Sequence, residues 1–311
     1  MSSSASKPAG YDFWASKRRL AALRGTLAFT VILLLSFVMM LPLVWMVCVS
    51  LKEPQNVFQN PPFRVDWQWQ NFRDAWYLQG LPSHSGDFWT DVQNFFGEKE
   101  SFWIYLWNTV IITICSTTGA VLSGALVAYG FARLRFPGRN ALFLLLISTM
   151  LVPAQVTMIP TYILYSALGW VGTFLPLIVP SWLGGAFNIF LLRQFFMSVP
   201  VELDEAAKID GCSTLGIFWR ILLPLSMPAL VTISIFAIVY NWNDFLNPMI
   251  YLKDTRDFTL AIGLTQFSSL YGNKTHLLMA ASTVVLMPIL VLFFIGQKYF
   301  IQGIATTGLK G

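Results

Sequence analysis

The residues Glu205-Ala206-Ala207-Lys208-Ile209-Asp210-Gly211, followed nine residues later by Ile221-Leu222-Leu223-Pro224, form a charged, helix-forming island between two long apolar stretches. A single membrane anchor has no need of such an island, and it contains no recognisable catalytic motif. The pattern therefore predicts a surface helix that a multi-span membrane protein presents to a soluble partner.

Local signals in and around the island predict two short helices. Asp204 and Lys208 are spaced i, i+4 in the favourable order, and acidic residues in a first helical turn are stabilised by the helix dipole. Gly211 suits the left-handed residue that ends a helix, and Ser213 can cap a second helix. Phe218, Ile221 and Leu222 provide an apolar stripe for that second helix.

Composition places the chain in a membrane. Of the 311 residues, 56% are hydrophobic and only 11% are charged, against about 25% charged in an average soluble domain. Apolar runs of about 20 residues recur along the whole length, so lipid must solvate much of the surface. The formal net charge is +5, and the distribution of the charged residues fits the orientation of a membrane protein rather than a nucleic-acid-binding patch.

Six segments are long enough to span a bilayer, and we expect an all-α, six-helix transmembrane bundle. The predicted spans are residues 25–51, 102–132, 141–165, 172–193, 227–250 and 277–297. Prolines interrupt several of them, so we expect kinked or broken helices, with unwound turns at Pro153 and Pro180. Small residues four apart in the second span favour close packing with another helix: Ser116, Ala120, Gly124, Ala128 and Ala132.

The positions of lysine and arginine predict the orientation. With the N-terminus inside, 13 of the 20 basic residues lie on the inner side, which agrees with the positive-inside rule. The predicted cytoplasmic parts are the N-terminal segment 1–24, the island within 200–224 and the tail 298–311. The predicted core is 102–297, and the outer loop 52–101 is rich enough in aromatic residues to form a small folded cap.

Polar residues inside the predicted spans are candidates for a translocation path, although hydrogen bonding between helices is an equally ordinary role for each. They are Gln155, Thr157, Asn188, Asn241 and Asn243. We expect Asp244 at a helix end on the outer surface, because no intramembrane lysine or arginine stands opposite it.

Catalytic chemistry finds no support in the sequence. The chain lacks Gly-x-x-x-x-Gly-Lys-Ser/Thr, His-Glu-x-x-His and Gly-x-Ser-x-Gly. Its two histidines and three separated cysteines predict no metal site and no disulfide framework. We therefore expect neither an enzyme nor a protein that binds nucleotide, metal or another cofactor by itself.

The island resembles a motif of ATP-binding-cassette (ABC) importer permeases. Glu-Ala-Ala, three residues, Gly, nine residues and Ile-x-Leu-Pro, here Glu205 to Pro224, match the EAA loop of that family in spacing and in predicted cytoplasmic position. Other stretches resemble its carbohydrate-uptake, maltose-permease-like branch: Ala128-Tyr129-Gly130-Phe131-Ala132-Arg133-Leu134, Phe136-Pro137-Gly138-Arg139, Leu191-Leu192-Arg193-Gln194-Phe195-Phe196, Trp242-Asn243-Asp244-Phe245 and the tail from Lys298-Tyr299-Phe300 to Gly308-Leu309-Lys310-Gly311.

The resemblance implies a type I importer permease in a bacterial inner membrane, paired with a second permease subunit, a homodimeric ATPase that binds ATP and Mg, and an extracytoplasmic sugar-binding protein. The implied ATPase-coupling residues are Glu205, Ala206, Ala207, Asp210, Gly211, Ile221 and Pro224, with Gly308, Leu309, Lys310 and Gly311 as a second ATPase contact. Thr259, Gly263 and Gln266 fall in a segment similar to the family's loop for the binding protein.

The implied cargo is a carbohydrate, most simply an oligosaccharide. Glycerol-phosphate or another polar solute remains an alternative within the same architecture. An ATP-independent secondary transporter is the rival class, which would require intramembrane ionisable residues or inverted repeats that the sequence does not display clearly.

Overall fold

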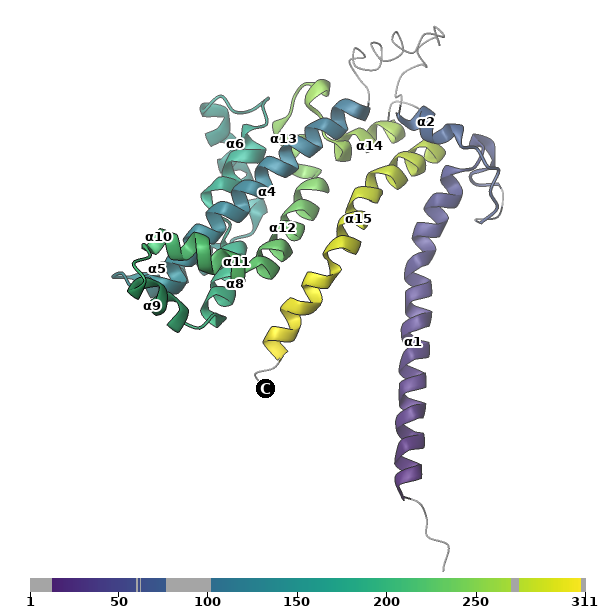
Figure 1. The fold of residues 1–311 in the computed structure, drawn as a ribbon. Helices are drawn as coiled ribbons and strands as arrows, with labels where there is room; N and C mark the ends of the chain where they lie inside the picture. Colours follow the sequence, from purple (N-terminus) through teal and green to yellow (C-terminus); the bar gives the residue numbers. More distant parts are fainter. Residues whose placement is uncertain (1–12, 60, 62, 77–101, 270–273, 309–311) are drawn as a thin grey trace, which may run out of the picture.

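The computed structural model describes residues 13–59, 61, 63–76, 102–269 and 274–308, and within them the chain is helical, without strands (Figure 1). Among these described residues, four stretches are helical, long and apolar enough to cross a membrane. They are Leu20–Ser50 of α1 (Phe13–Ser50), α4 (Phe102–Arg133), Leu175–Ser198, and Thr275–Lys298 of α15 (Thr275–Gly308). The third comprises α7 (Leu175–Ile178), the 3₁₀ turn η3 (Val179–Leu183) and α8 (Ala186–Ser198).

Two further candidate spans are bent pairs of helices, which gives up to six if each pair crosses once. In the first pair, α5 (Arg139–Ser148) and η2 (Thr149–Leu151) meet α6 (Ala154–Ala167) at 99°. Pro153 stands between them in an extended conformation, which confirms the predicted break. The 3₁₀ turn η3, which contains Pro180, lies at the other predicted position.

The second bent pair corrects the predicted span 227–250. Here α10 (Thr214–Ile217), η4 (Phe218–Leu222) and α11 (Leu223–Leu225) meet α12 (Met227–Trp242) at 78°. The helix α12 ends at Trp242, and a separate helix, α13 (Leu246–Tyr251), follows. Asp244 accepts the backbone N–H of Asn247 at 3.2 Å and so starts α13, while Pro248 fits its first turn but would interrupt a continuous helix.

The central element of the bundle is α4, which packs against α8 and α12. The predicted small-residue stripe faces α8 and η3 of this same chain: a Cβ on Gly124 would lie 3.5 Å from the Cβ of Asn188, and Gly119, in the same helix, lies directly against the Trp182 ring. The described side chains of α1 are largely exposed and apolar, and α1 stands apart from α4, α8 and α12 (Figure 1). Such a helix requires lipid around it.

The described part of the predicted outer loop is folded onto the end of α1. It contains η1 (Pro54–Asn56) and α2 (Gln70–Trp76). The buried Lys52 donates to the Pro61 carbonyl at 2.9 Å, and Asn71 donates to the carbonyls of Ser50 and Lys52. Of the loop's aromatic residues, Tyr77, Phe88, Trp89, Phe95 and Phe96 lie outside the described residues.

Candidate functional site

The predicted island forms two short helices, and hydrogen bonds close the turn between them. The first, α9, runs over Glu202–Ile209, and Gly211 follows with φ +82°. The Gly211 N–H donates to Lys208 and the Cys212 N–H donates to Ala207, which is the Schellman pattern of a helix end. Ser213 then accepts the Gly216 N–H at 3.1 Å and caps α10. The structure confirms both predicted caps.

The helix α9 has one buried face and one exposed face. Asp204 and Ala207, three residues apart, are buried in this chain, whereas Glu205, Ala206 and Ile209 are exposed. Ile209 keeps 87% of its surface accessible. Ala207 was expected to approach a partner, but it packs inward instead. The surface offered by α9 therefore combines charged and apolar side chains, and Asp210 and Gly211 continue it in the exposed turn.

A buried ion pair fastens α9 to the end of α4. Arg133 Nε lies 3.3 Å from Asp204 Oδ2, and the two side chains are only 6% and 8% exposed. The contact lacks the alignment of a hydrogen bond, but a second guanidinium nitrogen of Arg133 donates to the Val199 carbonyl at 2.8 Å. The sequence suggested Lys208 as the neighbour of Asp204. That pairing is wrong, because Asp204 points inward and Lys208 is exposed.

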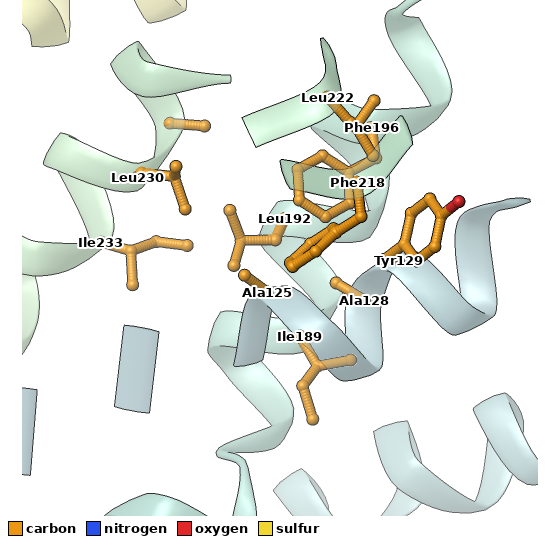
Figure 2. Packing of buried hydrophobic residues seen from close by; sticks show 11 residues of the cluster. Ala125, Ala128, Tyr129, Ile189, Leu192, Phe196, Phe218, Leu222, Leu230 and Ile233 are labelled. Carbon is orange, nitrogen blue, oxygen red and sulfur yellow. The ribbon is translucent and has the colours of Figure 1, made fainter. Parts of the chain in front are cut away.

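A second contact fastens α10 to the same end of α4. The Tyr129 hydroxyl donates to the Thr214 carbonyl at 2.9 Å, and the Tyr129 ring lies 5.1 Å from the Phe218 ring. Figure 2 shows Phe218 and Leu222 packed with Tyr129, Leu192 and Phe196 in a buried apolar cluster. Tyr129 and Arg133 are one helical turn apart on α4, and this spacing is the signal by which the sequence could have indicated a shared role.

The end of the island differs in shape from an ordinary α-helix. Residues Phe218–Leu222 form a π-helical turn, and after Leu223 comes Pro224, which has no N–H to donate to the preceding turn. Ile221 is half-buried and Pro224 is exposed. Of the predicted tail contact, Gly308 ends α15, while Leu309, Lys310 and Gly311 lie outside the described residues.

A pocket of about 380 Å³ with both polar and apolar lining residues lies between α6, α7, α12 and α13. Three of the predicted path residues line it, namely Gln155, Thr157 and Asn241. The other two lie elsewhere: Asn188 faces Gly124 between α8 and α4, and Asn243 is exposed and donates to the Val239 carbonyl. Sequence analysis missed the aromatic members of the pocket, because a tyrosine in an apolar helix gives no sign of which side it faces.

The segment predicted to contact a binding protein is mostly internal. Thr259 and Gly263 are buried, at and within α14 (Leu260–Ser269), and a Cβ on Gly263 would lie 2.6 Å from the Tyr105 ring of α4. Gln266 is half-buried and bonds the Tyr105 hydroxyl at 3.3 Å. A partner at this end would instead meet the exposed residues 253–256, which precede α14.

Comparison with known proteins decides the family. Residues 120–306 match the family described as binding-protein-dependent transport system inner membrane component. The chain belongs to this family. The chain therefore is a permease component of a transport system in the inner membrane, and its several apolar helices make it multi-pass.

Curated relatives of this permease cover most of its length. It is 34% identical to the probable ABC transporter permease protein YurM of Bacillus subtilis, over 87% of this chain and 83% of that protein. It is 37% identical to the arabinooligosaccharides transport system permease protein AraQ of Halalkalibacterium halodurans, over 70% and 77%. The melibiose/raffinose/stachyose import permease protein MelC of Bacillus subtilis is 32% identical, over 87% and 91%.

A solved structure shows the same fold. A chain of a bacterial ABC transporter involved in the import of the acidic polysaccharide alginate superimposes with a TM-score of 0.75, over 91% of this permease and 98% of that chain, at 22% identity. The described residues of the permease contain no group of three or more His, Cys, Asp or Glu side chains arranged to hold a metal ion.

Proposed function

We propose that this permease imports a carbohydrate, most simply an oligosaccharide, and that a separate ATPase drives it through α9. The observation that carries this proposal is the construction of α9. Its outer face presents Glu205, Ala206 and the 87% exposed Ile209, while its inner face is fixed to the central helix by a buried ion pair. A surface that is open to a partner and also fastened to the bundle can transmit force.

The same construction defines the path of that force. A displacement of α9 reaches α4 through Asp204 and Arg133, and a displacement of α10 reaches it through Thr214 and Tyr129. Because α4 packs on α8 and α12, movement of α4 would reorient helices on both sides of it. The chain contains no P-loop, so ATP and Mg would bind to the partner ATPase.

The arrangement of the ends supports the proposed orientation. The start of α1, the last turns of α15 and the island α9–α10 lie at one end of the molecule, with α2 and α14 at the other (Figure 1). The first end carries the elements that the charge distribution assigns to the cytoplasm. A homodimeric ATPase would dock there, with the tail at Gly308 as a second contact, and an extracytoplasmic binding protein would approach the opposite end. A second permease subunit would complete the pathway.

Carbohydrate is the cargo that the relatives favour. Those named for their cargo include permeases for arabinooligosaccharides, for melibiose, raffinose and stachyose, and for diacetylchitobiose. In one solved structure of the same fold, an alginate ABC transporter is bound to its periplasmic protein carrying an alginate pentasaccharide. Sugar recognition would then be shared among the binding protein and the two permease subunits.

Transport in proteoliposomes tests the proposal. The permease is purified with its co-expressed partners and reconstituted. Uptake of radiolabelled raffinose, stachyose and arabinotriose is measured with ATP on the side of the membrane that the ATPase faces. We expect uptake of at least one sugar with ATP and none with a non-hydrolysable analogue. Uptake driven by an ion gradient without ATP would identify a secondary transporter instead, and ATP-driven uptake of glycerol-phosphate alone would exclude carbohydrate as the cargo.

A further inference from the structure

The pocket between α6 and α12 combines the groups that proteins use to hold sugars. Polar side chains from three helices and one turn line it, among them Gln155 and Thr157 of α6, Asn241 of α12, Asn247 of α13, and Asp244 between α12 and α13. Its volume of about 380 Å³ falls within the range of small-molecule sites, which is roughly 300–1,000 Å³.

An aromatic wall closes one side of this pocket. Tyr165 and Tyr251 both line it, and their ring centroids lie 5.4 Å apart. Tyr162 stacks on Tyr251 at 6.2 Å, and Trp170 stacks on Tyr165 at 5.4 Å, so neighbours on both sides hold the two lining rings. An aromatic ring offers an apolar face beside a polar hydroxyl, and a sugar ring likewise has apolar C–H faces and polar edges.

The charge in the pocket is negative. Among the described residues that line it, Asp244 is the charged one, and it is half-buried. Asn247 donates its backbone N–H to one oxygen of Asp244 and its side-chain amide to the other, at 3.2 and 2.9 Å. An ionised carboxylate can accept about four hydrogen bonds, so helix capping uses only part of its capacity.

The location excludes lipid as the normal occupant. A carboxylate and several amides facing hydrocarbon would carry a large desolvation cost. The pocket adjoins the break between α12 and α13, at the end of the bundle opposite α9 (Figure 1). Water, a polar solute or the proposed second permease subunit would therefore face it, at the end where a solute would enter during import.

We propose that this pocket is a saccharide-binding subsite of the permease and that Asp244 makes it selective for uncharged sugars over uronates. The inference rests on the proposed carbohydrate transport. Sugar hydroxyls donate to the Asp244 carboxylate, and the ring packs on Tyr165 and Tyr251. A uronate brings a second carboxylate beside Asp244, where repulsion at roughly 6 Å with an effective dielectric of about 40 corresponds to about a ten-fold loss of affinity.

Protection of an engineered cysteine tests the subsite directly. Thr157 is exposed and lines the pocket, so Thr157→Cys, in a complete transporter whose Cys48, Cys115 and Cys212 are replaced by serine, reacts with the uncharged reagent N-ethylmaleimide. Thr173→Cys is the matched control, since Thr173 is exposed and lies outside the pocket. Labelling rates are measured without the binding protein, over a concentration series of stachyose or of alginate pentasaccharide.

We expect stachyose to slow labelling of Thr157→Cys at least about 3-fold, and alginate pentasaccharide to require about 10-fold higher concentration for the same effect. Adding Asp244→Asn, which retains a capping side chain for α13, removes most of that difference, and Thr173→Cys responds to neither sugar. Equal protection by both sugars, or a difference unchanged by Asp244→Asn, overturns the selectivity. ATP-driven uptake of stachyose without protection of Thr157→Cys overturns the subsite alone, whereas absence of any sugar uptake overturns the proposed function.

Discussion

Replacing Asp204 by asparagine removes one charge of the ion pair that fastens α9 to α4 and changes little else. Charges 3.3 Å apart interact by roughly 5 kcal/mol at an effective dielectric of about 20. Relief of the carboxylate's desolvation offsets part of this, and breaking a buried pair by removing one partner typically costs about 3–5 kcal/mol. The remaining charge of Arg133 would keep its hydrogen bond to Val199 but would have no carboxylate beside it.

The lost free energy destabilises the packing of α9 against α4. We therefore expect it to weaken binding of the ATPase to α9. If roughly 3 kcal/mol of it is expressed at that interface, the Kd rises about 100-fold. Kd is measured by titrating purified, labelled ATPase onto the permease in nanodiscs. Asp254→Asn is the matched control, because Asp254 also forms an ion pair, with Arg256 at 3.1 Å, but in an exposed position outside α9. We expect Asp254→Asn to change Kd less than about 3-fold, as for other exposed charges.

The charge-exchanged double variant Arg133→Asp with Asp204→Arg is a further check on the cause. It restores opposite charges at the same two positions, and we expect it to recover part of the lost affinity. The reasoning is refuted if Asp204→Asn binds the ATPase within about 3-fold of the unaltered permease, or if it weakens binding no more than Asp254→Asn does.

Three further changes probe other parts of the structure. Gly211→Val should weaken ATPase binding about ten-fold in the same titration, because a side chain at φ +82° costs roughly 1–2 kcal/mol. Gly211→Asn should weaken binding less, since asparagine tolerates the left-handed conformation better. Equal effects of the two substitutions would contradict the role of the left-handed turn. Gly119→Ala should lower the free energy of unfolding of the permease by about 1–3 kcal/mol, because the new methyl group would overlap Trp182. Gly130→Ala, on the same helix with open space around it, should not lower it. Equal losses in the two variants would refute the packing at Gly119. Hydrogen bonds from Asn56 and the Glu53 N–H hold the pKa of Asp66 below its usual 3.8, so their stabilising contribution is present above that pH and is lost as the pH falls through the lowered pKa. The melting-temperature difference between the unaltered permease and Asp66→Asn should therefore shrink on acidification below the usual value, and a difference that grows there would be contrary to this assignment.

Local signals in the sequence predicted the island well. The caps at Gly211 and Ser213 depend on hydrogen bonds that reach only a few residues along the chain, so the residue types alone indicate them. The break at Pro153 was predictable for the same reason, since a proline constrains its immediate neighbours.

Long-range partners were not predictable in this way. Arg133 and Asp204 come from segments that are distant in sequence, and Asp204 had a nearer plausible partner in Lys208. The close packing of Gly263 likewise depends on the Tyr105 ring of α4, which no pattern near Gly263 in the sequence indicates. The predicted span 227–250 was wrong at its end. Its apolar character continues past Trp242, but α12 ends there and the Asp244 cap starts a new helix.

The central claim is that the exposed face of α9 is the surface on which the ATPase docks. A photoreactive amino acid in place of Ile209, which is 87% exposed, tests it in the assembled transporter. The matched control replaces Ile163, a 62% exposed isoleucine of α6. We predict that irradiation joins the Ile209 variant to the ATPase subunit and that the Ile163 variant gives no such product. An active transporter in which position 209 yields no ATPase adduct, or yields no more than position 163, would contradict the account.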